Sequence, residues 1–542
     1  MMKKLRPLFR LAMAGLMLCL PGLLSAQTTL SDEARAADAA SLRRVMEKYE
    51  YYTKTTPHEK VYLHLDKPYY TKGDTIWYKA YMLFADSFHP DTLNLTLYVD
   101  VVQPDGRILA EQRIRVIDGI GHGQFVFPDA LTPGFYMIRA YTSWMRNFTD
   151  EPLFSRLIPV YGQEVTDASY HWNTSYRISS GPQEDTLKMT LFLTDNRYVS
   201  KADEPFRFDF RARGLHAMQG EPTTNADGTY RLNLTLPKRL KKATGNLSLT
   251  VGEGKSREKL TMAVPLLRTD SIGVRFFPEG GHLVTGVCSR VAFQVLDGGG
   301  TGVPATGAVF TSDGRVVQTF TADGKGVGAF YLTPKAGQRY YAEVEADFGD
   351  GLRLDARADL PEALPKGYVL EVFNLNGRDV QVCIKRKGIA DEELLGLTVR
   401  SGGRLAFAKM LPVKQDSLMF TLPRQDFPSG VSQITLFGVA GQPLAERLVF
   451  VNNYKPLKIN ISAPQDVYKP RELVKMDISV TDADGRPVEA DLSLAVTDIA
   501  QVIDTSRFEM NILTQMLLQS DLRGRITDPG YYVGDSTMAS RK

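Results

Sequence analysis

Two short stretches of the sequence resemble ligand-binding loops, and each lacks part of what its chemistry needs. Residues 251–256 read VGEGKS and end like a nucleotide phosphate loop, but that loop requires a glycine at the position of Leu249. Asp482 and Asp484 precede Gly485 as in a calcium loop, yet the third acidic position and the closing glutamate are absent. Neither nucleotide nor calcium binding is therefore predicted.

The histidines also give no sign of a catalytic or metal centre. No two of them stand at the i, i+4 spacing that a helix-borne zinc site uses; they are His58, His64, His89, His122, His171, His216 and His282. The Gly-x-Ser-x-Gly elbow of serine hydrolases does not occur. We predict that the chain is not an enzyme and that it uses no cofactor and no metal ion.

Aromatic residues are the remaining candidates for a binding site. Alternation along the stretch from Thr75 places Ile76, Tyr78, Ala80 and Met82 on one face of a strand and Thr75, Trp77, Lys79 and Tyr81 on the other. A platform of Tyr69, Tyr70, Trp77 and Tyr81 would stack against a glycan or a peptide. We favour a core position for Trp77 between two sheets, and keep the platform as the candidate binding site.

The first residues predict export. Lys3, Lys4, Arg6 and Arg10 precede an apolar run from Leu11 to Leu24, and Ser25, Ala26 and Gln27 follow it. This order is typical of a secretory signal peptide cleaved after Ala26. The run is shorter than the ~20 residues that a membrane-spanning helix needs. We expect no transmembrane helix after cleavage and a final location in the periplasm or at the outer membrane or cell surface.

Charge and cysteine content narrow the partners. The chain has 65 basic and 62 acidic residues, and the four basic residues of the leader leave a mature chain close to neutral. Near-neutral charge gives no electrostatic reason to bind nucleic acid. Only Cys288 and Cys383 remain after the leader, and we predict buried free thiols in different domains.

Internal repeats indicate the fold. A glycine-containing strand, an LxP or FP stop, a glycine and a second strand recur at residues 121–141, 326–344 and 420–437, with a partial copy at 227–240. Asp-Gly-Arg turns stand at residues 105–107, 313–315 and 484–486. The copies of the glycine and proline element recur about every hundred residues, which is the size of one immunoglobulin-like sandwich. We predict an all-β chain of tandem β-sandwich domains.

Two helices complete the prediction. The stretch from Ser31 to Tyr52 contains no proline or glycine and suits an exposed leading helix. A second helix, at about 506–519, opens with a capping box of Ser506 and Glu509 and places Phe508, Ile512 and Met516 on one face. We expect this face to lie against a sandwich.

The repeat phase gives the domain boundaries. After the signal peptide at 1–26 and a helical lead segment at 27–56, we predict sandwiches at 57–162, 183–268, 269–362, 363–455 and 456–542, with a linker at 163–182. The last domain is expected to be incomplete, because its final residues are polar. A missing strand would expose a sheet edge that can accept a partner strand.

Several of these segments resemble the macroglobulin family. EKVYLHLDKPYYTKGDTIWYKAYM (residues 59–82), together with the strand pair at 121–141, resembles the MG2 domain of large envelope proteins from Bacteroidetes-type bacteria. FFPEGGHLVTG (276–286) and SVTDADGRPVEADLSLAVTD (479–498) resemble later macroglobulin-type domains. The resemblance implies β-sandwiches, and similar architectures continue into the plug of a TonB-dependent receptor.

The residues depart from the family at its reactive centre. Full-length macroglobulins capture proteases through a thioester in a Cys-Gly-Glu-Gln motif, whereas here Cys288 precedes Ser289 and Cys383 precedes Ile384. We therefore expect a non-enzymatic envelope scaffold that binds a protein or glycan partner. Two alternatives stay open: an endopeptidase inhibitor that acts without a thioester, and an accessory or N-terminal part of a TonB-dependent outer-membrane uptake system. Their partners would be a protease or an outer-membrane transporter.

Overall fold

A computed structural model describes the chain from residue 32 to residue 533. The gaps within this range are 132–133, 149–152, 162–169, 181–183, 196–198, 213–214, 238–243, 253, 255–256, 267–270, 349–352, 375–378, 390–392, 466, 498–509, 525 and 527–528. The predicted signal peptide at 1–26 lies outside the described residues.

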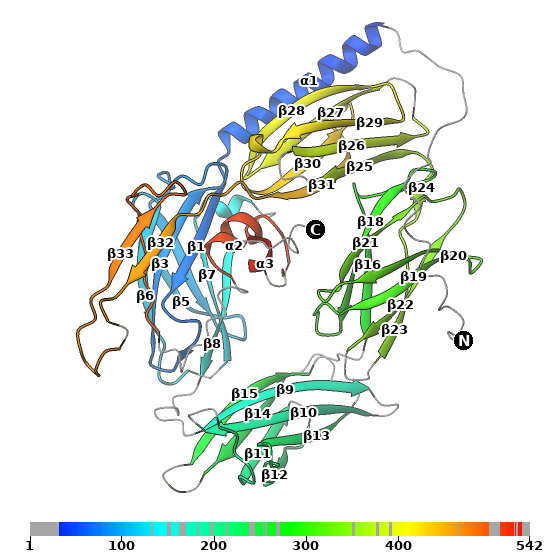
Figure 1. Ribbon diagram of the computed structural model, residues 1–542. Coiled ribbons are helices and arrows are strands. Elements are labelled where there is room, and N and C mark those ends of the chain that lie inside the picture. The colour runs from blue at the N-terminus through cyan, green and yellow to red at the C-terminus, as the bar shows by residue number, and fades with distance from the viewer. Residues whose placement is uncertain are drawn as a thin grey trace.

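Four β-sandwiches follow one another around a ring, with the fourth returning to the first (Figure 1). Each has seven principal strands in one topology. The first, second and fifth strands form one sheet, and the other sheet has the order fourth, third, sixth, seventh. The main pairings are antiparallel. The prediction of an all-β tandem-sandwich fold is confirmed.

The first and second sandwiches contain the following strands. The first has β1 (Glu59–Leu65), β3 (Thr75–Phe84) and β6 (Ile120–Val126) facing β5 (Ile108–Arg115), β4 (Thr96–Val102), β7 (Gly134–Tyr141) and β8 (Phe154–Tyr161), with the short β2 (Tyr70–Thr71) beside β8. The second has β9 (Tyr170–Ser180), β10 (Glu184–Asp195) and β13 (Thr229–Pro237) facing β12 (Met218–Gly220), β11 (Phe206–Ala212), β14 (Thr244–Val251) and β15 (Glu258–Pro265).

The third and fourth sandwiches repeat this plan. The third has β16 (Ile272–Pro278), β18 (Ser289–Asp297) and β21 (Val327–Leu332) facing β20 (Val316–Ala322), β19 (Ala305–Thr311), β22 (Tyr340–Asp347) and β23 (Arg353–Asp359), with the short pair β17 (Leu283–Val284) and β24 (Ala363–Leu364). The fourth has β25 (Gly367–Phe373), β26 (Asp379–Lys387) and β29 (Ser417–Pro423) facing β28 (Arg404–Val413), β27 (Glu393–Ser401), β30 (Gly430–Phe437) and β31 (Pro443–Val451).

The repeated glycine and proline element is the same piece of every sandwich. Its three full copies are the fifth and sixth strands, β6 and β7, β21 and β22, and β29 and β30, which lie in different sheets of their sandwich. The partial copy at 227–240 covers the fifth strand of the second sandwich, β13. The three full copies are therefore equivalent in three dimensions, and the partial copy matches their first strand.

Each sandwich encloses its own apolar core. Alternate residues of the central third strands point inward, and in β4 these are Leu97, Val99 and Val101, at most 2% exposed. Each such side chain contributes about 1.5–3 kcal/mol by leaving water. Separate cores of this kind hold the other three sandwiches.

The predicted linker at 163–182 is partly wrong. Residues 170–180 form β9, the first strand of the second sandwich, and pair with β10. Because β9 is an edge strand, its outward positions hold polar residues, and only inward ones such as Trp172 and Ile178 pack on the core. The outward-facing polar residues of β9 are the reason why the sequence of this segment suggested a linker.

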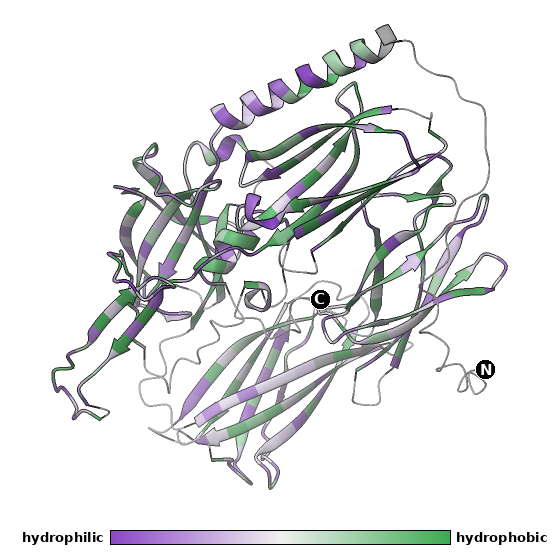
Figure 2. Ribbon diagram, turned by 45° about the horizontal axis from the view of Figure 1, so that its top comes forward, coloured by the Kyte–Doolittle hydropathy of each residue, from purple (hydrophilic) through white to green (hydrophobic). Residues whose placement is uncertain are grey.

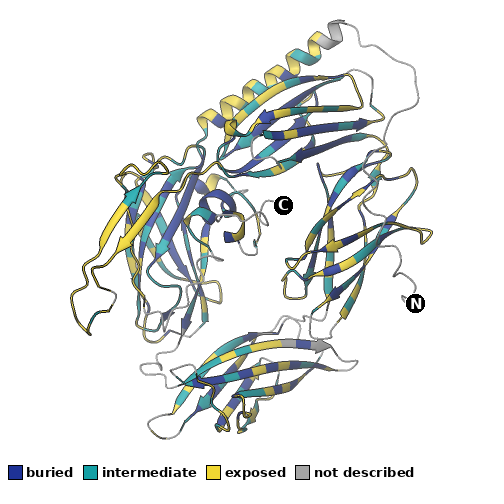
Figure 3. Ribbon diagram, in the orientation of Figure 1, coloured by how far each residue is buried: buried dark blue, intermediate teal, exposed yellow. Residues whose placement is uncertain are grey.

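The predicted leading helix is confirmed as α1 (Asp32–Thr55). One side of α1 is buried rather than exposed. It lies along β27 and β28 of the fourth sandwich, with a largely exposed outer side (Figures 1 and 3). Leu42 is fully buried and faces Gly396, and Val45 faces Gly441. Tyr49 meets the ring of Phe437 edge-on, so a stripe at helical spacing docks α1 on the sandwich.

Among the described residues from 456 to 497, the regular structure is the antiparallel pair β32 (Lys458–Ser462) and β33 (Asp477–Thr481). The hairpin lies beside the first sandwich and is mostly exposed, although several of its residues are hydrophobic (Figures 2 and 3). The stretch from 488 to 497 is extended and belongs to no sheet among the described residues.

The C-terminal helical segment is confirmed, with a different start. The predicted cap, Ser506 and Glu509, lies outside the described residues, and the observed cap is a reciprocal pair of Asn511 and Thr514. The helical turns are α2 (Ile512–Thr514), a π-helix (Gln515–Gln519) and α3 (Gly530–Val533). Residues 514–518 are buried, whereas Ile512, which the sequence placed on the packed face with Met516, is exposed.

Two short 3₁₀ turns lie at Met145–Asn147 and Arg424–Asp426 in the described part of the chain. Among the described helices, none is both long enough and apolar enough to cross a membrane.

Candidate functional site

Strand β3 carries Trp77 and Tyr81, two of the four residues of the predicted binding platform. Ile76, Tyr78, Ala80 and Met82 are buried, as the alternation predicts. Trp77 is 55% exposed on the outer face of the sheet β1–β3–β6, so the preferred expectation of a core position for Trp77 is wrong. Its register opposite Gln124 of β6 puts it on the side away from the core.

The other three predicted residues are not exposed in this way, and one of them, Tyr81, is half-buried and packs against the core of the first sandwich. Tyr70 is fully buried, its ring packs near Phe127, and its hydroxyl donates to Asp66 Oδ1 at 2.7 Å. Burial, and then the Asp66 carboxylate, raise the pKa of Tyr70, so that the phenol stays neutral. Tyr69 is half-buried. An exposed platform therefore cannot include Tyr70, because β2 turns that side chain into the core.

Trp77 instead borders an open groove of about 450 Å³ on the outer face of the first sandwich. Its walls come from all three strands of the sheet and from a distant extended segment; they are His64, Asp66, Trp77, Tyr78, Lys79, His122, Gly123, Gln124, Ser493 and Leu494. The groove therefore combines an aromatic surface, several hydrogen-bonding groups and the cation of Lys79.

The extended segment around Ser493 is held at the groove by polar contacts. The Ser493 hydroxyl lies 2.6 Å from His64 Nδ1 and accepts a hydrogen bond from the Tyr81 hydroxyl at 2.8 Å. Lys79 Nζ donates to the Leu492 carbonyl at 3.0 Å and lies 3.6 Å from Asp491 Oδ1. A serine, a backbone carbonyl and a carboxylate of an extended chain are thus recognised together.

Electrostatics keep His64 neutral in this position. Burial is the main cause that lowers the pKa of His64, and the nearby Arg156 lowers it further. A neutral imidazole has one acceptor nitrogen and one donor nitrogen, so it can pair with a hydroxyl in either direction. The site therefore favours a neutral hydrogen-bonding partner at His64 and an anionic one at Lys79.

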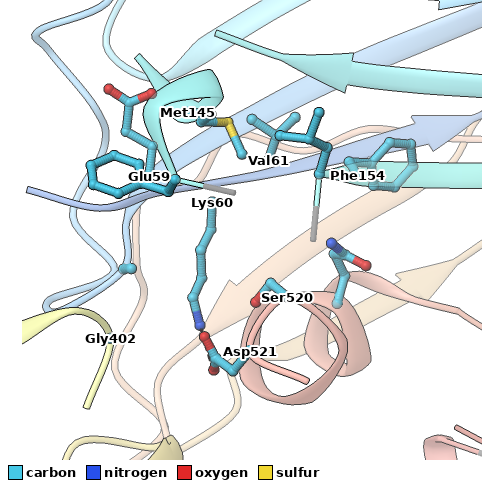
Figure 4. A pocket seen from close by; sticks show the side chains of 12 residues that line it. Glu59, Lys60, Val61, Met145, Phe154, Gly402, Ser520 and Asp521 are labelled. Carbon is cyan, nitrogen blue, oxygen red and sulfur yellow. Dashed lines mark hydrogen bonds and ion pairs between the residues drawn. The ribbon is translucent and has the colours of Figure 1, made fainter. Parts of the chain in front are cut away.

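A second, enclosed cavity lies where the first and fourth sandwiches meet the C-terminal helices (Figure 4). Lys60 extends into this joint, and its Nζ donates to the Met516 carbonyl at 2.6 Å and to Asp521 Oδ2 at 2.8 Å. The cavity measures about 10 Å³, the size of one water molecule. It is too small for a ligand, so we interpret these residues as a structural joint.

Glu59, next to Lys60, points the other way in Figure 4 and is buried within the first sandwich. Its carboxylate accepts hydrogen bonds from Thr142 and Asn94. Burial, and then the neighbouring Asp91 carboxylate, raise the pKa of Glu59 to about 7, although the Thr142 hydrogen bond opposes them. Glu59 is therefore a titratable group of the fold rather than of the groove.

The two cysteines lie near the joint between the third and fourth sandwiches. Both are free thiols, as predicted; Cys383 is buried and Cys288 is half-buried. Burial raises the pKa of Cys383. Among the described residues, no cluster of histidine, cysteine and acidic side chains has an arrangement that would hold a metal ion.

The sequence did not predict the contribution of Asp491, Leu492 and Ser493 to the groove. They are more than 400 residues from Lys79 and Tyr81. Their alternating pattern indicated only a strand. The one available sign was on β3, where Thr75 and Lys79 share the outer face of the strand with Trp77 and are half-buried.

No protein-family model matches this sequence, and no curated protein matches it either. Among solved structures, the native α2-macroglobulin of Escherichia coli is similar at 13% identity with a TM-score of 0.33, covering 79% of this chain and 32% of that chain. Its trypsin-activated form gives 13% identity and a TM-score of 0.35, covering 79% and 33%. A tetra-tandem repeat from the extending region of a large adhesion protein gives 14% identity and a TM-score of 0.15, covering 73% and 100%.

The chain spans about a third of the length of the macroglobulins that it matches. The activity of those longer proteins is therefore not assigned to this chain on the basis of the similarity.

Proposed function

We propose that this chain is a non-enzymatic, exported scaffold of the bacterial cell envelope that binds an extended segment of a partner protein in the groove beside Trp77. The observation that carries this proposal is the chain's own segment 491–494, which lies at the groove in an extended conformation. Its contacts with His64, Lys79 and Tyr81 are those a peptide ligand would make. Export is supported by the leader sequence.

The joints between sandwiches support the scaffold role. Lys60 and Asp521 form a buried ion pair between the first sandwich and the C-terminal helices. Glu279 of the third sandwich and Arg447 of the fourth form a second pair, at 2.7 Å, in which Glu279 is buried and Arg447 is 38% exposed. Buried pairs of this kind hold a defined geometry, because breaking either one leaves a charge without its partner. A binding face on the first sandwich would thus be presented in a defined orientation.

The groove is tested by capture from envelope extract with the purified mature chain. Trp77→Ala removes the exposed ring and should lower the amount of the captured partner about tenfold, because exposed aromatic anchors dominate binding energy. Phe277→Ala is the matched control, since Phe277 is 50% exposed on the third sandwich, far from the groove in sequence. Equal capture by both variants would refute the groove as the binding site.

The captured material also identifies the ligand class. A protein that is lost in the Trp77→Ala sample and is still captured after glycosidase treatment supports the proposal. A ligand that survives protease treatment and is released by glycosidase would instead assign the groove to a glycan.

The inhibitor alternative gives a different result in a separate assay. A macroglobulin-like inhibitor would slow the cleavage of a protein substrate by trypsin in proportion to its concentration, whereas the proposed scaffold leaves the rate unchanged. The uptake-system alternative predicts a reading frame for a TonB-dependent plug and barrel next to this one. Capture of that transporter through the Trp77 groove would join the scaffold and uptake roles.

A further inference from the structure

A second open groove, of about 360 Å³, lies on the third sandwich between β20 and β21 (Figure 1). We call it the β20–β21 groove. Its volume falls within the range of about 300–1,000 Å³ that small-molecule sites occupy in proteins. It shares no residue with the groove beside Trp77, so it is a separate candidate site.

The groove opens where two edge strands separate. β20 and β21 are edge strands of the two sheets of the third sandwich, and a tight turn joins them. Near this turn the strands are close, because a Cβ added to Gly328 would lie 2.8 Å from the Thr321 carbonyl oxygen. At the far end, Val316 and Val317 of β20 and Tyr331 of β21 line the groove instead.

A β-bulge shapes the β20 wall of the groove. Along β20, Gln318 and Val316 pair with consecutive residues of β19, which leaves Val317 as the extra residue of the bulge. Val316 and Val317 both line the groove and are exposed. A bulge in an edge strand disrupts the ladder and turns the edge away from a further strand. The groove is therefore unsuited to an extended peptide that pairs through its backbone.

The lining of the groove contains two cations and no carboxylate. The cations are Arg315 and Lys335, and neither side chain forms a salt bridge with a described residue. Arg339, near Lys335 in sequence, does pair with an acidic side chain. Asp313, close to Arg315 in sequence, is exposed and interacts mainly with Thr311. The positive charge of the groove thus favours an anionic ligand.

A buried hydroxyl adds a hydrogen-bond donor. Tyr340 lines the groove and is only 7% exposed, and its hydroxyl oxygen accepts from Lys335 N at 2.9 Å. Among the described residues, none accepts the proton of this hydroxyl. Buried phenol groups usually have an acceptor. A ligand oxygen next to Lys335 would supply it, and a carboxylate oxygen would satisfy both groups.

The remaining walls combine an aromatic ring with a hydroxyl. The Tyr331 side chain is 50% exposed, and Thr333 beside it is also exposed. A sugar ring has an apolar C–H face that can lie on an aromatic ring, and hydroxyls that can pair with a threonine. Together with the cations, these walls fit a sugar that carries an acid group.

We propose that the β20–β21 groove binds an acidic sugar of the uronate type. Lys335 and the Tyr340 hydroxyl would hold the carboxylate, and Tyr331 would stack on the C–H face of the ring. This site goes beyond the proposed function, because it gives the third sandwich a ligand of its own, independent of the groove beside Trp77.

The test is calorimetric titration of the full mature chain with a tetramer of galacturonate. A galactose tetramer of the same linkage is the neutral control, and N-acetylated, C-amidated tetraglutamate is the peptide control with the same number of carboxylates. The uronate should bind saturably, and each control at least about tenfold more weakly, because one lacks the charge and the other the ring. Uronate binding should weaken several-fold between about 0.1 M and about 1 M salt, since the Debye length falls from about 10 Å to about 3 Å.

Matched variants separate the groove from the rest of the surface. Lys335→Gln should weaken uronate binding about tenfold, whereas Lys188→Gln, on the exposed face of β10, should have no effect. Tyr331→Ala should weaken it about tenfold as well, and Tyr176→Ala is the control, because Tyr176 is exposed on β9. Tyr340→Phe removes only the buried hydroxyl and should weaken binding several-fold.

The proposal is overturned if the uronate does not bind saturably, or if Lys335→Gln binds it as tightly as Lys188→Gln does. Tetraglutamate that binds as tightly as the uronate would also overturn it and assign the groove to an acidic peptide. Trp77→Ala should bind the uronate like the unchanged chain. Loss of uronate binding in that variant would place the sugar in the other groove and refute the site on the third sandwich.

Discussion

Two neighbouring charged residues at the start of β1 point in opposite directions and serve different parts of the fold (Figure 4). Lys60 joins the first sandwich to Asp521, whereas Glu59 stays within that sandwich beside Asp91. Both side chains are almost fully buried. Adjacent residues of a strand face opposite sides, and here each side holds polar partners rather than solvent.

Glu59 makes stability depend on pH. Its pKa rises from 4.5 to about 7 on folding, so the folded chain binds more protons than the unfolded chain between these values. The stabilisation is complete below pH 4.5 and is lost as the pH rises through 7. Glu59→Gln should leave stability at pH 4 nearly unchanged and raise it at pH 8 by up to about 3 kcal/mol.

Urea unfolding of both proteins at several pH values measures this effect. The exposed Glu221→Gln serves as the control and should follow the unchanged chain at every pH. A Glu59→Gln protein less stable than the unchanged chain at pH 8 would show that the ionised carboxylate is needed for the fold.

At the scale of elements, the turn after β16 shows why the sequence FFPEGG (276–281) ends in two glycines. Gly280 and Gly281 both have positive φ, at +83° and +102°, so both accept glycine far better than other residues. A Cβ at Gly280 would lie 2.7 Å from Leu370 N of β25, whereas a Cβ at Gly281 would meet nothing within 4 Å. The glycine pair thus lets the third sandwich approach the fourth closely.

The two glycines make a matched pair of variants. Gly281→Ala should cost roughly 1–2 kcal/mol from backbone strain alone. Gly280→Ala should cost more and should lower the melting temperature further, because the new methyl group also pushes against β25. Calorimetry of both variants checks the order, and equal losses would mean that the close approach to Leu370 is not maintained in solution.

At the scale of the whole molecule, buried carboxylates connect the third sandwich to the fourth. Glu279 accepts from Arg447 Nε at 2.7 Å, and Glu371 accepts from Lys385 Nζ at 2.6 Å and from Arg290 N at 3.1 Å. Burial, the largest single cause, lowers the pKa of Lys385, but the hydrogen bond to Glu371 and the attraction of its charge together outweigh burial, so the pKa of Lys385 is raised. Lys385 also donates to the Cys288 carbonyl, so both sandwiches share one polar network.

Arg447→Met should open this joint. It leaves the buried Glu279 without its charged partner, and because Arg447 is itself 38% exposed we expect a loss of about 1–3 kcal/mol. Small-angle scattering should then show a larger radius of gyration. Arg339→Met is the control, because the Arg339–Glu362 pair is exposed and exposed pairs contribute only about 0–1 kcal/mol. An unchanged scattering profile for Arg447→Met would mean that the joint does not depend on this pair.

The sequence by itself determined the class of fold, the leading helix and the equivalence of the glycine and proline elements. These depend on local rules: alternation marks a strand, glycine permits a positive φ, and a proline stop ends a strand where the chain changes sheet. The exposed Trp77 and the strand nature of β9 were missed for a local reason as well. A strand whose outward face carries aromatic or polar residues gives an ambiguous pattern, since either face can be read as the inner one.

Only the tertiary structure decided which residues meet across long sequence distances. Lys60 and Asp521 are 461 residues apart, and Tyr81 and Ser493 are 412 apart. Such contacts depend on how whole sandwiches pack against each other. The local periodicity of a sequence gives no information about this packing.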